Sequence, residues 1–223
     1  MDREQYNTEL INAAAQGDMS LVAHHLRAVD KSALNQALIE ASRNGYENCV
    51  EILIPVTDRM SRAVALENAV VQNNVGCVQL LIPVCNPSSF ENRPLTLAAM
   101  DGNVECLKLL LPYCNLSHMH TPLIAAATRD YVECVKLILP YGLPLTNGAK
   151  VFVETLLKNN IECMQLLLPH CNLQECHAYL AKNHPGSENE QRMQHVIAQW
   201  QRDTLTTALT DCPPSKNTST RKM

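Results

Sequence analysis

Two stretches of the chain place two cysteines and a proline at the same positions. They read VECLKLLLPYCN at residues 104–115 and IECMQLLLPHCN at residues 161–172. Cysteine thiolates bind metals, form redox couples and act as nucleophiles, so either stretch could do chemistry. On a continuous helix, however, Cys106 and Cys114 would lie roughly 12 Å apart along the axis. That separation is too large for a disulfide or a shared metal ion, so we expect structural roles and reduced thiols.

A denser group of potential metal ligands lies in the segment HCNLQECH. It brings His170, Cys171, Cys176 and His177 within eight residues, and these side-chain types bind zinc. Their arrangement, two adjacent pairs with four residues between them, matches no common zinc knuckle. We therefore expect neither a metal nor a cofactor. A metal-binding or enzymatic function seated around His170–His184 remains the alternative.

Motifs of nucleophilic or phosphate chemistry are missing from the sequence. It has no Gly-x-Ser-x-Gly element and no phosphate-binding glycine loop, and it contains only seven glycines. Three recurring acids, Glu105, Glu133 and Glu162, fall where a helix is expected to begin, and a carboxylate there interacts favourably with the helix dipole. We predict no catalytic residue and no enzymatic activity.

The composition narrows the classes of partner. The chain is 46% hydrophobic and 18% charged, and its net charge of −4 comes without a basic stripe that could neutralise phosphates. No apolar run approaches the roughly 20 residues that cross a bilayer, and the beginning of the sequence does not resemble a signal peptide. We expect a cytoplasmic protein that binds neither nucleic acid nor membrane.

A repeat of 28 to 29 residues organises most of the chain. The clearest marks are five prolines, each after an apolar run, and five cysteines that keep step with them: Pro55, Pro83, Pro112, Pro140 and Pro169; Cys49, Cys77, Cys106, Cys134 and Cys163. A weaker unit at residues 8–26 precedes them, with Leu21 in place of the cysteine. Such a period indicates a stack of similar structural units.

Each unit contains two short apolar periodicities of helical spacing. In the unit at residues 93–115, Leu95, Ala98 and Ala99 mark the first helix, and Val104 and Leu107 begin the second. The residue between the helices is always of a type that tolerates a left-handed backbone: Gly17, Gly45, Asn73, Gly102, Asp130 and Asn159. The proline that follows should end each second helix within a residue or two.

Two segments resemble the ankyrin repeat: RPLTLAAMDGNVECLKLLL at residues 93–111 and TPLIAAATRDYVECVKLIL at residues 121–139. The family signature is Thr-Pro-Leu-His-x-Ala-Ala, two free residues, Gly, and a Val-Val-x-x-Leu-Leu helix. The resemblance implies an all-α solenoid of about six helix-turn-helix repeats. Since ankyrin repeats are usually about 33 residues long, the projecting hairpins should be trimmed to short loops such as residues 115–120. The signature His is replaced, by Ile39, Glu67, Thr96, Ile124 and Val153, so its hydrogen bond must be replaced or absent.

We divide the chain into a solenoid at 1–183, a capping helix at 184–211 and a disordered tail at 212–223. The expected repeats are 5–33, 34–61, 62–90, 91–118, 119–147 and 148–176. Residues 187–190 form a capping box in sequence, and the capping helix has an apolar stripe that includes Trp200. We expect this stripe to cover the open end of the stack.

The resemblance also implies how the chain works: ankyrin repeats bind other proteins through loop tips and through the concave face lined by the first helices. Transferred onto this sequence, the positions before the turn and at the tips predict a partner-binding set of Arg43, Asn44, Val71, Gln72, Phe90, Met100, Asp101, His118, Met119, His120, Thr128, Arg129, Leu157 and Lys158. Trimmed hairpins could instead let these residues pack on neighbouring repeats. We expect a monomeric adaptor or inhibitor, and the LLxP ending of the repeats suggests a bacterial or viral effector acting in a host cytosol.

Overall fold

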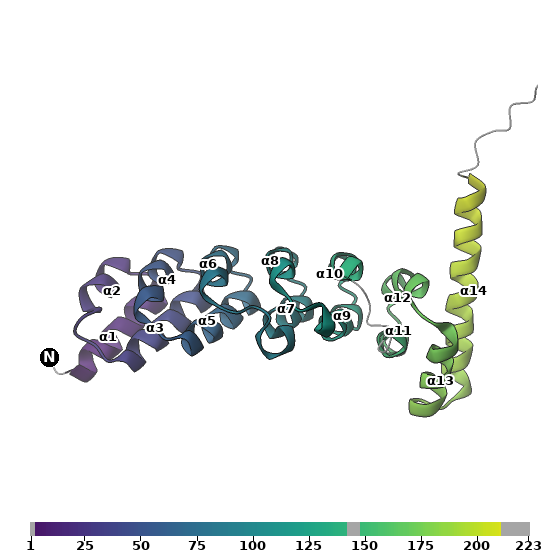
Figure 1. Ribbon diagram of the computed structural model, residues 1–223, viewed down its shortest axis with the longest axis horizontal. Helices are drawn as coiled ribbons and strands as arrows, with labels where there is room; N and C mark the ends of the chain where they lie inside the picture. The colour runs from purple at the N-terminus through teal and green to yellow at the C-terminus, as the bar shows by residue number, and fades with distance from the viewer. Residues whose placement is uncertain (1–2, 142–147, 211–223) are drawn as a thin grey trace, which may run out of the picture.

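The computed structural model describes residues 3–141 and 148–210, and within these ranges all regular secondary structure is helical. Helices of a first and a second kind alternate along an elongated stack (Figure 1). The first kind comprises α1 (Arg3–Gln16), α3 (Lys31–Asn44), α5 (Arg59–Val71), α7 (Ser89–Asp101), α9 (His120–Ala127), α11 (Gly148–Leu157) and α13 (Leu173–Asn183). The second kind comprises α2 (Met19–His25), α4 (Glu47–Leu53), α6 (Val75–Leu81), α8 (Val104–Leu110), α10 (Val132–Ile138), α12 (Ile161–Leu167) and the longer α14 (Ser187–Thr210). The predicted helical solenoid is confirmed.

The turns inside the helix pairs have the predicted left-handed backbone. All six turn residues have a positive φ, between 56° at Asn73 and 80° at Gly45. At Gly102 a side chain would also be blocked, because a Cβ atom there would lie 2.7 Å from the Tyr131 ring of the next repeat. At Gly102, both the left-handed backbone and the repeat that packs on the turn therefore favour glycine.

The prolines end the second helices as expected. α8 ends at Leu110, two residues before Pro112, and the chain continues as the 3₁₀ turn η3 (Leu111–Tyr113). The same arrangement recurs at η1 (Ile54–Val56), η2 (Ile82–Val84), η5 (Leu139–Tyr141) and η6 (Leu168–His170). Proline lacks the N–H that would continue the α-helical bonding, so a tighter turn follows.

The connections between repeats are short, and asparagine side chains form hydrogen bonds across them. The loop at residues 115–120 contains the 3₁₀ turn η4 (Leu116–His118), and the described residues form no β-strand. Asn92 donates from Nδ2 to the Asn115 carbonyl at 2.7 Å, and the Asn115 amide donates back to Asn92 Oδ1 at 2.8 Å. Asn7 makes a similar reciprocal pair with Asp30.

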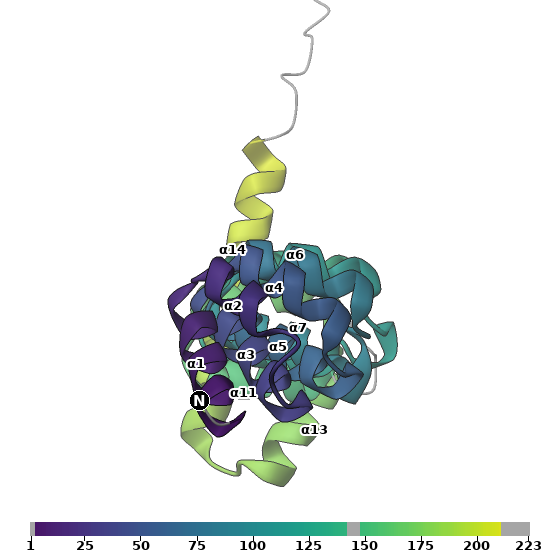
Figure 2. The same cartoon turned by 90° about the vertical axis from the view of Figure 1, so that its left-hand side faces the viewer.

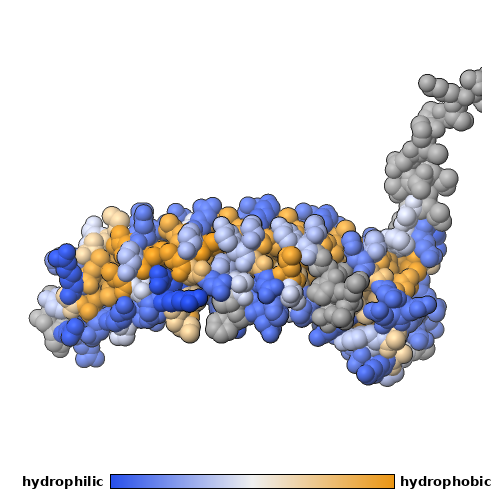
Figure 3. Space-filling view, in the orientation of Figure 1, coloured by the Kyte–Doolittle hydropathy of each residue, from blue (hydrophilic) through white to orange (hydrophobic). Residues whose placement is uncertain are grey.

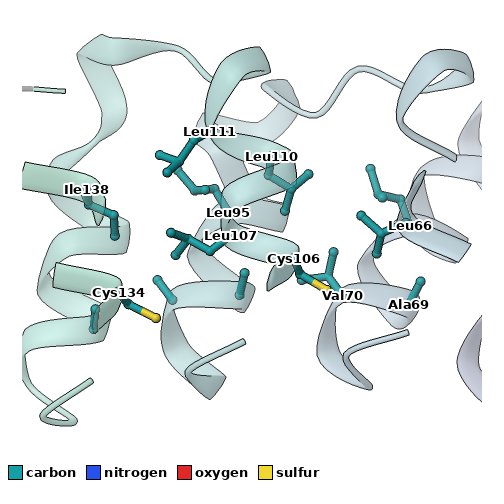
Figure 4. Close-up of a cluster of buried hydrophobic side chains, with 14 of the residues drawn as sticks. Leu66, Ala69, Val70, Leu95, Cys106, Leu107, Leu110, Leu111, Cys134 and Ile138 are labelled. Carbon is teal, nitrogen blue, oxygen red and sulfur yellow. The ribbon is translucent and has the colours of Figure 1, made fainter. Parts of the chain in front are cut away.

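The core is a continuous layer between the two rows of helices. Figure 4 shows Cys106, Leu107 and Leu110 of α8 packed between side chains of neighbouring repeats. All five cysteines that keep step with the repeat are fully buried, as predicted: Cys49, Cys77, Cys106, Cys134 and Cys163. Leu21 does not join them, contrary to expectation, and is 37% exposed. These positions face the preceding repeat, and Leu21 belongs to the first helix pair of the stack.

The far end of the stack is closed by α13 and α14. α14 packs against α11, α12 and α13, with Met193 and Val196 buried and Ile197 and Trp200 partly buried against the core. Figures 1 and 2 show α14 standing across the stack and rising beyond the other helices. In the described part of the chain, no helix is both long and apolar enough to span a membrane.

Candidate partner-binding surface

An apolar stripe runs along the outward face of α5, the first helix of the third repeat. Ala65, Leu66, Ala69 and Val70 face the core. Met60, Val64 and Val71 lie on the opposite side at helical spacing, with exposed fractions of 64%, 37% and 39%. We call these three residues the α5 stripe. Only Val71 of the three was predicted from the sequence, although Met60 and Val64 are recognisable there by their position opposite the alanines of α5.

Paired charges flank the α5 stripe on both neighbouring helices. On α3, the Arg43 guanidinium bonds Glu40 at 3.1 Å and donates from Nε to Asn68 Oδ1 on α5, also at 3.1 Å. On α7, Arg93 Nε lies 2.9 Å from Glu67 Oε2 of α5. The outward face of α3, α5 and α7 thus has an apolar centre and a polar rim, which is the anatomy of a protein contact site.

The predicted positions before each turn are divided between exposed and half-buried side chains. Exposed residues are Arg43, Asn44, Val71, Gln72, Asp101, Arg129 and Lys158; half-buried residues are Met100, Thr128 and Leu157. Leu157 packs against the core, and the Thr128 hydroxyl donates back to the Ile124 carbonyl at 2.7 Å. Some of the predicted residues therefore pack on their neighbours and others are exposed, and the exposed ones are spread from the second repeat to the sixth.

Arg129 has a structural contact in addition to its exposure. Its Nη1 donates to the Met100 carbonyl of the preceding repeat at 2.8 Å. Asn103 likewise links two repeats, because its Nδ2 donates to the Val70 carbonyl of the preceding repeat at 2.7 Å. Substituting Arg129 would therefore perturb the stack as well as the surface.

The predicted loop-tip residues require one correction. Met119 is fully buried, because the η4 turn leads it into the core, where Asn92 Nδ2 lies 3.7 Å from its sulfur. It cannot contribute to a surface. His118 and His120 are half-buried, and the Nδ1 atom of His120 has no hydrogen-bond partner among the described residues. Phe90 lies in the first turn of α7, but its side chain falls outside the described part of the structure.

The thiols that suggested chemistry lie in the core or against it. Burial raises the pKa of Cys106 to about 11 and that of Cys114 to about 12, so both stay protonated at neutral pH. The Cys106 thiol donates to Asn73 Oδ1 in the preceding turn at 3.3 Å. All nine described cysteines are free, and Cys212 lies outside the described residues. Within the same residues, no three ligating side chains gather at one point, the HCNLQECH segment included.

Apolar residues gather in a band along the stack, between hydrophilic margins, on the face seen in Figure 3. The helix pairs and their shared core define a helical-repeat scaffold, in which each unit buries its apolar face against the next. Such a molecule presents long surfaces assembled from equivalent positions of successive repeats.

Comparisons with known proteins identify the kind of repeat. A family model of ankyrin repeats in three copies matches residues 66–150. Among 33 solved chains that match, the crystal structure of the human ASB11 ankyrin repeat domain is 25% identical, with a TM-score of 0.61. The match covers 74% of this chain and 85% of that one. A search of curated proteins found no match. The sequence match over residues 66–150 and the shared fold support an ankyrin-repeat protein.

Ankyrin repeats typically form non-catalytic scaffolds that bind other proteins. The chain is accordingly a protein-interaction module.

Proposed function

We propose that the chain is an adaptor or inhibitor that captures a partner protein on the outward face of its first helices, centred on the α5 stripe. The main support is that Met60, Val64 and Val71 are exposed on one side of α5, whereas the opposite side of this helix packs into the hydrophobic core. Clustered apolar side chains on a surface are typical of interaction sites. Arg43 and Arg93, held by Glu40 and Glu67, form the polar rim that fixes the register of the partner.

The proposal is tested by replacing the stripe with charge. In the double variant Met60→Glu/Val64→Glu, two carboxylates would have to be desolvated on binding, so partner capture should fall at least about 10-fold. The matched control is Ile161→Glu on α12, where an apolar residue of similar exposure, 43%, lies away from this face. Capture is measured by quantitative mass spectrometry on equal amounts of folded protein. Equal loss in the stripe variant and the control would contradict the placement.

We place this activity in a cytosol and propose that the chain acts as a monomeric effector inside a host cell. Five repeats use cysteine as a small core residue, which suits a reducing compartment. The effector role rests on the LLxP ending of the repeats. Proximity labelling by the tagged chain in host cells should recover cytosolic proteins, and this recovery should fall with Met60→Glu/Val64→Glu. Recovery that is unaffected by the double variant would count against it.

A further inference from the structure

Asparagine ties successive repeats together at three of the junctions between them. Each of these residues directly precedes a second helix, and its Nδ2 donates to a carbonyl near the end of the preceding first helix. The three bonds run from Asn74 to Ser42 at 2.9 Å, from Asn103 to Val70 at 2.7 Å and from Asn160 to Ala127 at 2.7 Å. All three lie on the side of the stack that holds the turns within the helix pairs, which we call the turn edge. They join the second repeat to the third, the third to the fourth and the fifth to the sixth.

Tyrosine takes the place of this asparagine at the other two junctions within the six repeats. Tyr46 precedes α4, and Tyr131 precedes α10. Each ring packs over the glycine of the preceding turn, since a Cβ atom at Gly17 would overlap the Tyr46 ring and one at Gly102 would meet that of Tyr131. Among the described residues, neither tyrosine makes the hydrogen bond that the asparagines make. The first and second repeats, and the fourth and fifth, therefore lack this link.

A surface cavity lies beside each tyrosine. The cavity at Tyr46 has a volume of about 280 Å³ and extends from Gly17 to Gly45. The cavity at Tyr131 has a volume of about 270 Å³ and extends from Gly102 to Asp130. Both cavities thus lie between the turns of successive repeats. Close-packed protein leaves few spaces of this kind, and each one gives two neighbouring turns room to approach without a clash.

Exposed side chains make the hydrogen bonds across the turn edge at the two tyrosine junctions. Asn44 Nδ2 donates to the Ala15 carbonyl at 3.4 Å, and Arg129 Nη1 donates to the Met100 carbonyl at 2.8 Å. The asparagine bonds to Ser42, Val70 and Ala127 are partly buried, whereas these two are exposed. Water competes for an exposed hydrogen bond, so the tyrosine junctions should open more easily.

The opposite side of the stack stays tied at both tyrosine junctions. On this side, where one repeat leads into the next, Asn7 pairs with Asp30 and Asn92 pairs with Asn115. We call it the loop edge. A junction held at the loop edge and weakly linked at the turn edge can change its angle by opening at the turn edge.

We propose that the two tyrosine junctions are the hinges of the solenoid. The second, third and fourth repeats, from α3 to α8, move as one rigid block, and the repeats on either side rotate relative to it about the loop edge. The α5 stripe lies on the rigid block, so a partner would meet a fixed centre while both ends adjust to its outline. The hinges themselves do not depend on the stripe being a binding site.

The experiment measures distance distributions in the full chain by double electron–electron resonance. Spin labels are attached to a genetically encoded keto amino acid, which leaves the native cysteines unlabelled. One labelled pair replaces Glu51 and Lys108, and the other replaces Lys108 and Gln165; these are equivalent positions on second helices. Each pair spans two junctions, but only the pair 108–165 spans a tyrosine junction. We expect its distribution to be about twice as wide as that of the pair 51–108.

Three variants, each checked for native circular dichroism, assign the difference to the junction residues. Tyr131→Asn supplies the missing amide and should narrow the 108–165 distribution to the width of 51–108. The reverse exchange, Asn103→Tyr, should widen the 51–108 distribution. Arg129→Ala leaves the Tyr131 ring in place and should widen 108–165 alone.

Equal widths for the two pairs in the unmodified chain would overturn the proposal. Equal widening of both pairs by Arg129→Ala would overturn it as well, and so would a folded Tyr131→Asn variant with an unchanged 108–165 width. In either case the flexibility would not be located at the tyrosine junction.

Discussion

At the scale of single residues, the cysteines of the repeat behave as small apolar side chains. Desolvation raises the pKa of each of them, to about 11 at Cys77 and Cys106 and to about 12 at Cys163. In the unfolded chain the same thiols ionise near the ordinary value of 9.0. The folded and unfolded states therefore differ in proton affinity over an alkaline range.

This difference predicts alkaline destabilisation. Below pH 9 the thiols are protonated in both the folded and the unfolded state, so they add no pH dependence to the free energy of unfolding. Between about 9 and 12 the unfolded state loses protons that the folded state keeps, so the free energy of unfolding falls with rising pH. Urea unfolding followed by circular dichroism from pH 7 to pH 11 should show the midpoint falling above pH 9. Replacing Cys77 and Cys106 with valine should flatten the fall, and an equally steep fall in that variant would contradict the cause.

Single positions also show where sequence reasoning succeeds and fails. Cys106 could be assigned to the core because its position recurs in five units in register with an apolar helix face. Met119 and Leu21 were misassigned, because their burial depends on neighbours in space. The η4 turn carries Met119 inward, and Leu21 lies in the first helix pair that the structure describes, where its side chain is exposed.

At the scale of elements, the turns and helix ends follow local rules that the sequence displays directly. Glycine, asparagine and aspartate occupy the six left-handed turns, and proline ends the second helices. The Asn92 bonds to Asn115 were not foreseen, since a long-range side-chain partner leaves no periodic signal. Of the α5 stripe, only Val71 stands in the pair before the turn, so the family pattern did not predict Met60 and Val64.

The turn at Gly102 gives a prediction at this scale. Gly102→Ala places a Cβ on a backbone with φ of 71° and 2.7 Å from Tyr131, so we expect a loss of about 1–2 kcal/mol in unfolding free energy. Asn159→Gly is the matched control, because it keeps the left-handed turn at φ 62° and removes an exposed side chain. Chemical denaturation measures both. A loss at Gly102→Ala no larger than that at Asn159→Gly would contradict the steric account.

At the scale of the whole molecule, each repeat contacts only its neighbours, so stability should be transmitted along the stack with decreasing strength. The sequence indicated the solenoid and a terminal helix that covers its end. It could not show how far α14 rises beyond the stack, since helix length carries no information about docking (Figure 1). The described α14 buries Met193 and Val196 against the last repeats.

Removing this contact should loosen only one end of the molecule. Met193→Ala deletes a fully buried side chain and should cost about 2–4 kcal/mol locally. Hydrogen exchange followed by mass spectrometry should quicken in α11, α12 and α13 and stay unchanged in α1 to α4. If hydrogen exchange became faster along the whole chain, the prediction would be wrong, because the cooperative unit would then be larger than a repeat and its neighbours.

The central claim is that the α5 stripe is where a partner protein docks. The most direct measurement places a photo-crosslinking amino acid at Val64 and, in a separate chain, at Ile161, and compares the adducts formed with cytosolic proteins. The account predicts a discrete crosslinked partner from position 64 that is lost when Met60→Glu is added, and no such adduct from position 161. Equal adducts from both positions, or an adduct from position 161 alone, would contradict it.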